Sequence, residues 1–178
     1  NNNGITGSAD PADRTLIGSA QPNFTYGLTN NLTFGNWNLN FFFQGVQGNQ
    51  LFNASRIDLE GMFDSKNQST AVLDRWTTPG QITSVPRPFN GNAEVLGSGI
   101  TAGSRFYEDA SFIRLKTATF GYNVPSSLLK RIKVERARVY VQAYNLYTWT
   151  KWTGFDSEFI NLGSGNNGTI PQPRTITF

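Results

Sequence analysis

The stretch Phe24–Gln44, FTYGLTNNLTFGNWNLNFFFQ, carries the pattern that decides the fold. Apolar and polar residues alternate along it with a period of two, which is the period of a β-strand whose two faces meet different surroundings. Gly35-Asn36 interrupts the alternation with a two-residue connection of the kind that accepts positive φ. The stretch therefore predicts a β-hairpin. Its apolar face would carry Phe24, Tyr26, Leu28, Leu32 and Phe34 in the first strand and Trp37, Leu39, Phe41 and Phe43 in the second.

The same alternation returns in two later segments, 118–124 and 136–149. Their apolar positions are Ala118, Phe120, Tyr122 and Val124, and Ala137, Val139, Val141, Ala143, Tyr147 and Trp149. The preceding stretch 112–116 is out of phase with 118–124, so we expect a β-bulge or a change of environment near Lys116. Pro125–Ile132 predicts a single helical turn with Pro at its start. A last short strand is expected at 172–178.

The connections between these strands differ greatly in length. Two are short, at 35–36 and about 125–134, and two are long, at 49–110 and about 150–171; the first long one has 62 residues, with short helices expected around 57–63 and 70–76. Strands of about ten alternating residues, with short turns at one end and long loops at the other, are typical of a transmembrane β-barrel. The apolar face would then meet lipid and the polar face a wet lumen, with the long loops extracellular and the short turns periplasmic.

The composition excludes most other classes of protein. Charged residues make up 15% of the 178 residues, against roughly 25% on average, while aromatic residues reach 13%. The chain has no Cys and no His, which excludes disulfide scaffolds, Ser-His-Asp triads and HExxH sites. No apolar run approaches the roughly 20 residues of a membrane helix. A net charge of +3 is too small to indicate nucleic acid by itself.

A soluble β-sandwich is the competing interpretation, because its strands alternate as well. Functionally, it would be a secreted β-domain that binds carbohydrate without transporting it. Sandwich exteriors usually carry Lys and Glu, whereas the polar faces here are mostly uncharged. Aromatic residues also stand near the predicted strand ends, as interface girdles do in barrels: Phe34, Trp37, Tyr147 and Trp149.

Carboxylates in the predicted loops offer two chemical alternatives, a calcium site and an acid/base pair for glycoside hydrolysis. The first would use Asp109, Asp156 and Glu158, and the second Asp58, Glu60 and Asp64. The spacing of the first group lacks the ligand density of a calcium loop, and sequence alone does not place the second group. We therefore predict loop hydrogen bonds, with no catalytic, metal or cofactor site.

The one dense charge cluster lies in the second short connection. It has five basic residues within nine positions, namely Lys130, Arg131, Lys133, Arg136 and Arg138. Nucleic-acid binding would need exposed stacking aromatics or a recognised motif beside the cluster. We interpret it as a solvated periplasmic turn near lipid headgroups, with Arg136 and Arg138 directed into the lumen.

Eight short blocks of sequence resemble those of one known family and occur in the same order as in that family. They are 22–28 PNFTYGL, 41–48 FFFQGVQG, 74–80 DRWTTPG, 107–116 YEDASFIRLK, 120–125 FGYNVP, 138–148 RVYVQAYNLYT, 153–158 TGFDSE and 171–178 PQPRTITF. Together they cover nearly the whole chain. They resemble the C-terminal barrel segment of SusC/RagA-type TonB-dependent outer-membrane transporters of Bacteroidota. One departure is Ser157, where the family usually has Pro. Members also usually continue for about half a strand past the position of Phe178.

The resemblance implies an all-β fold of antiparallel transmembrane strands, forming the C-terminal part of a large barrel of about 22 strands. Residues 1–178 would be one segment of it, with the plug domain and the TonB-contacting box far upstream. The whole transporter would import a glycan or peptide across the outer membrane without covalent catalysis. Its partners would be the remaining barrel and plug, a SusD-type surface lipoprotein, the TonB complex and outer-membrane lipid.

Two sets of residues are predicted to serve transport. The loop set, facing substrate or the lipoprotein lid, is Arg75, Trp76, Arg87, Phe89, Phe106, Tyr107, Trp152 and Phe155. Aromatic faces can stack on sugars and Arg can bind carboxylates, although any one of these residues is also explained by packing between loops. The lumen-facing set is Asn38, Asn40, Gln44, Arg136, Arg138, Tyr140, Gln142 and Tyr144.

Overall fold

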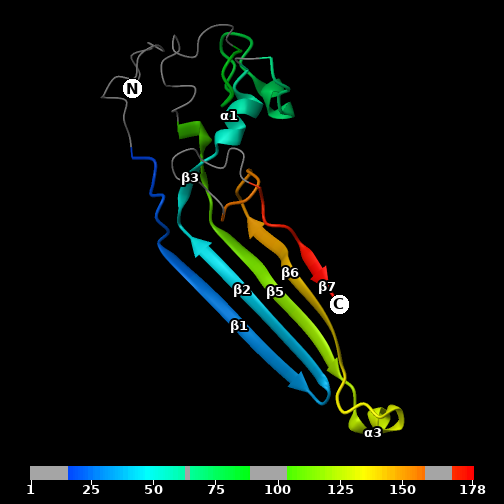
Figure 1. The fold of residues 1–178 in the computed structure, drawn as a ribbon. Coiled ribbons are helices and arrows are strands. Elements are labelled where there is room, and N and C mark those ends of the chain that lie inside the picture. Colours follow the sequence, from blue (N-terminus) through cyan, green and yellow to red (C-terminus); the bar gives the residue numbers. More distant parts are fainter. Residues whose placement is uncertain (1–15, 63–64, 89–103, 159–169) are drawn as a thin grey trace. The chain divides into compact units, whose positions relative to one another are not determined.

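The computed structural model describes residues 16–62, 65–88, 104–158 and 170–178 (Figure 1). The chain divides into two compact units, which are described separately. The sheet unit comprises Pro22–Asn49, Ala110–Lys151 and Pro171–Phe178, and the loop unit comprises Asn1–Gln21, Gln50–Asp109 and Trp152–Ile170.

The sheet unit is one antiparallel sheet of five strands in the order β1-β2-β5-β6-β7 (Figure 1). The strands are β1 (Phe24–Phe34), β2 (Trp37–Gln47), β5 (Phe112–Asn123), β6 (Arg138–Thr150) and β7 (Thr175–Thr177). The predicted hairpin is confirmed, because Phe34 pairs with Trp37 and Gly35 has a φ of 55°. β7 is shorter than the 172–178 expected, and β6 begins at Arg138 rather than at 136.

The predicted bulge lies at Lys116. Phe42 of β2 pairs with Thr117, and the next residue, Phe43, pairs with Leu115, so β5 has one more residue than β2 at this point. The extra residue reverses the alternation within β5. Leu115 before the bulge and Ala118 after it consequently lie on the same face of the sheet. This explains why the sequence on the two sides of Lys116 is out of phase.

The register places most of the apolar side chains of the five strands on one face, whereas Phe42, Val46 and Phe112 lie on the other. Leu28, Phe43, Leu115 and Tyr147 lie in one row across the sheet, as do Leu39, Phe120 and Val141 in another. Rings on this face touch one another, with Trp37 stacked on Phe120 at 5.1 Å and Phe43 at 6.1 Å from Trp149. Much of the face is nevertheless exposed in this chain, for example Phe120 at 50% and Val139 at 67%.

The connection from β5 to β6 contains the predicted helical turn. Here α3 (Ser126–Leu129) follows Pro125 and continues into the 3-10 turn η4 (Lys130–Ile132). Lys133 ends the turn in the left-handed region, at a φ of 57°, and the Val134 N–H donates to the Leu129 carbonyl at 3.2 Å. Leu129 is buried, so it anchors the turn.

The loop unit contains a small two-stranded ladder and short helices. β3 (Gln50–Phe52) pairs with β4 (Tyr107–Asp109), and the helices are α1 (Ala54–Glu60), η2 (Thr70–Asp74) and η3 (Ser104–Phe106). Both expected helices are present, but α1 begins three residues earlier than predicted, and the β3–β4 ladder was not predicted. Within the described part of the chain, no helix is both long enough and apolar enough to cross a membrane.

Candidate functional site

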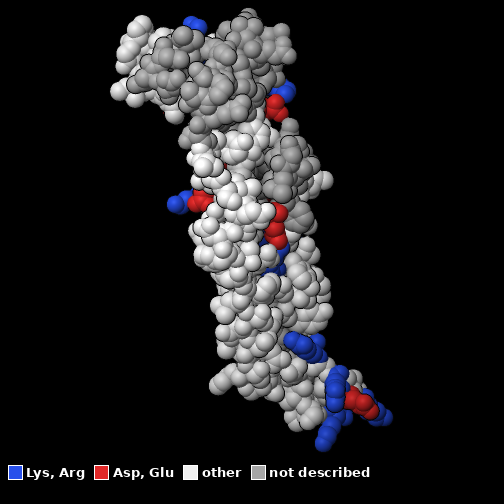
Figure 2. Space-filling model, turned by 90° about the vertical axis from the view of Figure 1, so that its left-hand side faces the viewer, with Lys and Arg blue, Asp and Glu red and all other residues white. Residues whose placement is uncertain are grey.

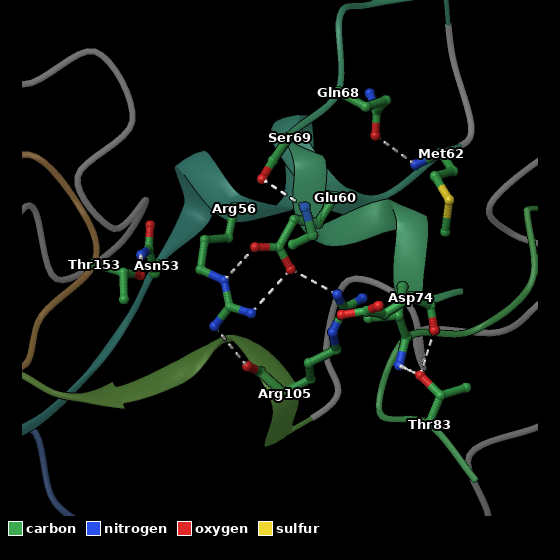
Figure 3. Close-up of polar contacts among 12 residues, drawn as sticks. Asn53, Arg56, Glu60, Met62, Gln68, Ser69, Asp74, Thr83, Arg105 and Thr153 are labelled. Atoms are coloured by element: carbon green, nitrogen blue, oxygen red, sulfur yellow. Dashed lines mark hydrogen bonds and ion pairs between the residues drawn. The ribbon is translucent and has the colours of Figure 1, made fainter. Parts of the chain in front are cut away.

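Four charged side chains form a network at the centre of the loop unit (Figure 3). Arg56 and Glu60 are one turn apart on α1 and make a bidentate ion pair, with both N···O distances 2.9 Å. Arg56 Nη1 also donates to Glu108 at 2.6 Å, and Arg105 Nη2 donates to the second Glu60 oxygen at 2.6 Å. The Glu60 side chain is only 9% exposed. Its charge is therefore balanced by two guanidinium groups rather than by water.

Phe106 lies beneath this network. The guanidinium carbons of Arg56 and Arg105 are 5.8 and 5.2 Å from the centre of its ring, within the range of cation–π attraction. The ring is 2% exposed. Within this chain Phe106 is therefore a packing residue of the network.

Glu108 joins the two long connections to each other. Its carboxylate accepts hydrogen bonds from the Thr153 backbone N–H at 3.0 Å and from the Thr153 hydroxyl at 2.8 Å, besides its ion pair with Arg56. The Asn53 side chain donates to both Glu108 and Thr153. Burial alone would raise the pKa of Glu108, but the hydrogen bonds from Thr153 and Arg56 outweigh it and hold that pKa below its ordinary value.

Among the carboxylates considered for chemistry, Asp58, Glu60 and Asp156 are engaged in ion pairs or loop hydrogen bonds. Asp58 pairs with Lys66 at 2.7 Å and Glu60 with the two arginines, while Asp64 lies outside the described residues. Asp156 accepts from the Glu158 backbone N–H at 3.0 Å. Among the residues that the structure describes, no three His, Cys, Asp or Glu side chains come together in a way that could hold a metal ion.

A polar pocket of about 530 Å³ lies beside the network in the loop unit. Its lining includes two cationic and two anionic side chains, together with η2 residues and the segment 81–85: Arg56, Glu60, Ala71, Leu73, Asp74, Gln81, Ile82, Thr83, Ser84, Val85 and Arg105. Thr83 fixes the segment, because its hydroxyl donates to the Asp74 carbonyl at 2.6 Å (Figure 3). The pocket thus has no net charge of its own.

The predicted loop set is spread over the loop unit. Tyr107 lies on β4 with its ring 5.2 Å from that of Phe52, and Trp152 is buried. Arg87 and Phe155 are exposed, the latter by 67%. Arg75 and Trp76 directly follow η2 and are half-buried. Phe89 lies outside the described residues.

Seven members of the predicted lumen-facing set share the polar face of the sheet: Asn38, Asn40, Gln44, Arg138, Tyr140, Gln142 and Tyr144. Arg136 does not, because it precedes β6 and lies exposed in the connection. On the same face Asn40 donates to Asn31, its partner on β1. The face therefore carries a hydrogen-bonding surface with little charge.

Sequence reasoning missed a buried cation on this face. Arg114 is 4% exposed and its Nε donates to the Thr148 hydroxyl at 2.8 Å, while its guanidinium lies 5.4 Å from the ring of Phe112. Nearby, Lys116 Nζ donates to the Gln172 side chain at 3.2 Å. The phase reversal at Lys116 was the available signal, because it moves Arg114 to the polar face.

No family model matches the chain. Individual proteins do: TonB-dependent receptors P3 and P26 of Formosa agariphila are 34% and 33% identical to it over 96% and 93% of its length. The chain spans only 17% of the length of each of these curated relatives.

Solved structures give the same result. The RagAB peptide importer in its closed-closed state superposes with a TM-score of 0.68 at 30% identity, over 84% of this chain and 16% of the solved one. A further RagAB peptide transporter structure gives 0.66 at 29% identity, over 80% of this chain and 15% of the other.

The exposed apolar face, the polar face with little charge and these superpositions define the class: the chain folds as an antiparallel sheet similar to the strands of a β-barrel transporter. More particularly, its homologues are TonB-dependent receptors and its structural neighbours are RagA-type transporters, as the sequence resemblance indicated. The expectation that the chain is not an enzyme is confirmed, because these relatives are receptors and importers.

Proposed function

We propose that the whole protein imports an oligomeric nutrient, glycan or peptide, across the bacterial outer membrane in a TonB-dependent manner, and that this chain supplies part of its barrel wall. The observation that carries the proposal is the continuous apolar face of the sheet, whose side chains remain exposed, such as Leu28 and Phe120 at 56% and 50%. Water is a poor surrounding for such a face, and hydrocarbon is a favourable one. The opposite face suits an aqueous lumen, because it carries amides, hydroxyls and phenols.

The positions of the connections support an orientation in the membrane. Val46, Phe112 and Thr150 are register partners, so both long connections leave the same end of the sheet. Trp37, Tyr122 and Val139 are partners at the other end, where the connections are short. Barrels place long loops outside and short turns in the periplasm. We therefore assign 49–110 and 150–171 to the cell exterior.

The sheet also requires further strands. β1 and β7 are edges, and an open sheet edge in hydrocarbon leaves backbone groups unsatisfied at several kcal/mol each. We infer that residues 1–178 are a C-terminal segment that closes against other strands of the same protein, which would also contain the plug that contacts TonB. The polar-face residues would then line part of the lumen.

The partner and substrate follow from the resemblance. We assign a SusD-type surface lipoprotein as the lid over the long loops, where Arg87 and Phe155 are exposed and available for contact. Peptide is supported as a substrate class by the structural neighbours, which are peptide importers by name. Glycan is the alternative substrate class, and the uptake experiment below distinguishes it from peptide.

Spin labels on the full-length protein in lipid vesicles test the proposal. A label at Leu39 or Val139 should be relaxed by oxygen dissolved in the bilayer and shielded from a polar relaxant, whereas a label at Asn38 or Tyr140 should show the reverse. Equal shielding of both faces from oxygen would refute the barrel and favour a soluble carbohydrate-binding domain. Uptake of labelled oligopeptides and oligosaccharides, with and without TonB, then separates the two substrate classes.

A further inference from the structure

The short-turn end of the sheet unit carries a concentration of positive charge, which we term the basic tip. It consists of Lys130, Arg131, Lys133, Arg136 and Arg138, all exposed. Figure 2 shows Lys and Arg side chains (blue) gathered with acidic atoms (red) at the end of the sheet unit. Between positions 130 and 138 the only carboxylate is Glu135. The tip therefore has a net charge of +4 within nine residues.

No anion on the described part of the chain neutralises this charge. Among the described residues, none of the five tip cations takes part in the ion pairs of Arg56, Lys66 and Arg105. Arg138 makes a cation–π contact with the Tyr140 ring at 5.8 Å. Cations held this close in one turn repel one another, so the folded tip favours a counter-anion from outside the chain.

Exposed apolar residues are interleaved with the cations. Leu128, Ile132 and Val134 are 57%, 67% and 40% exposed, although Leu129 in the same turn is buried. A turn that met only water would gain nothing by exposing these side chains. A membrane interface accommodates both kinds, because aliphatic residues reach the acyl boundary while Lys and Arg keep their charged ends among the headgroups.

We propose that the basic tip binds anionic phospholipid headgroups of the leaflet that faces the periplasm. This inference rests on the proposed membrane function, and it adds a selectivity that the function does not require. The chemistry recognised is the phosphodiester of an anionic lipid, with Arg131 able to donate two parallel hydrogen bonds and Lys130 and Lys133 acting as point charges. The contact anchors the short end of the sheet at a defined depth.

Lipid selectivity of the full-length protein tests the proposal. The protein is reconstituted in phosphatidylcholine vesicles that contain trace spin-labelled phosphatidylglycerol or spin-labelled phosphatidylcholine, and electron paramagnetic resonance measures the motionally restricted lipid. We compare wild type with the triple variant Lys130→Gln, Arg131→Gln, Lys133→Gln. A control triple variant removes the same charge elsewhere: Arg87→Gln, Lys151→Gln and Arg174→Gln.

We expect the wild-type protein to restrict phosphatidylglycerol in preference to phosphatidylcholine. In the tip variant the ratio of the two restricted lipids should fall by about fivefold or more. The control variant should retain it, and added salt should weaken it in wild type. An unchanged preference in the tip variant overturns the inference while leaving the barrel intact, and would direct attention to an acidic periplasmic protein instead. Absence of restricted lipid of either kind would refute the membrane function itself, and the inference with it.

Discussion

The sheet unit and the loop unit are stabilised in opposite ways. The sheet unit exposes large apolar side chains on one face and holds its strands together through continuous backbone ladders. In the described residues of the loop unit the strand pairing is a three-residue ladder, and the centre is an ion-pair network in which the Glu60 side chain is 9% exposed. One unit therefore depends on the solvent that meets its apolar face, and the other on the charge state of a few side chains. Substitutions and pH should affect them differently.

The largest effect is expected at Glu60. Replacing it with Gln leaves the partly buried Arg105 without its anion and leaves Arg56 with Glu108 alone, and breaking such a network typically costs about 3–5 kcal/mol. Asp58→Asn on the same helix removes an exposed ion pair and should cost less than about 1 kcal/mol. Amide hydrogen exchange of α1 in the full-length protein measures both. Equal protection in the two variants would mean that the network does not hold the loop unit together.

The sheet unit should respond to charge according to face. Val141→Arg places a cation on the apolar face and should cost about 2–4 kcal/mol near the bilayer midplane. Gln142→Arg, the next residue along β6, places the same cation on the polar face and should cost much less. Folding in lipid vesicles with denaturant titration measures the pair. Similar losses for both variants would contradict the assignment of faces.

Glu108 should make the loop unit sensitive to acid. The pKa of Glu108 is lower in the folded protein than its ordinary value of about 4.5 in the unfolded chain. Its contribution to the stability of the loop unit is therefore present in full above the unfolded pKa, and is lost as the pH falls through the lower, folded pKa. Glu108→Gln should cost about 1.5–3 kcal/mol at neutral pH, since charged hydrogen bonds to Thr153 and Arg56 are lost. Hydrogen exchange of the Thr153 amide follows the transition. A variant that keeps the wild-type acid response would exclude Glu108 as its source.

The smallest effect is expected at the hairpin turn. Gly35 has a positive φ and open space around it, so Gly35→Ala should cost about 1 kcal/mol through backbone strain alone. Gly35→Asn should be milder, because Asn tolerates the left-handed region better than Ala. Chemical denaturation of the reconstituted protein compares the two. A greater loss with Asn than with Ala would indicate that steric contact, rather than φ, governs the position.

The two units also differ in how far sequence predicts them. The β1–β2 hairpin and the Lys116 bulge were predictable, because a period of two and its reversal are local signals. The Arg56–Glu60 pair has the spacing of a helical ion pair and was detectable in principle. Its other partners were not, since Arg105 and Glu108 lie 45 and 52 residues along the chain from the groups they contact. No local sequence pattern predicts contacts between residues so far apart in the chain.

The extra residue at Lys116 bears on how such strands tolerate insertion and deletion during evolution. In a strand of unbroken alternation, gain or loss of one codon exchanges the faces of every residue on one side. β5 already contains such a shift at Lys116. Opposite it, β6 has two residues without register partners, Asn145 and Leu146, and Asn145 has a φ of 51°. Removing Lys116 alone would turn Ile113 and Leu115 toward the polar face. A length change at this position is therefore expected in relatives only together with a second length change that restores the faces. Alignments of relatives should then show a one-residue gap there.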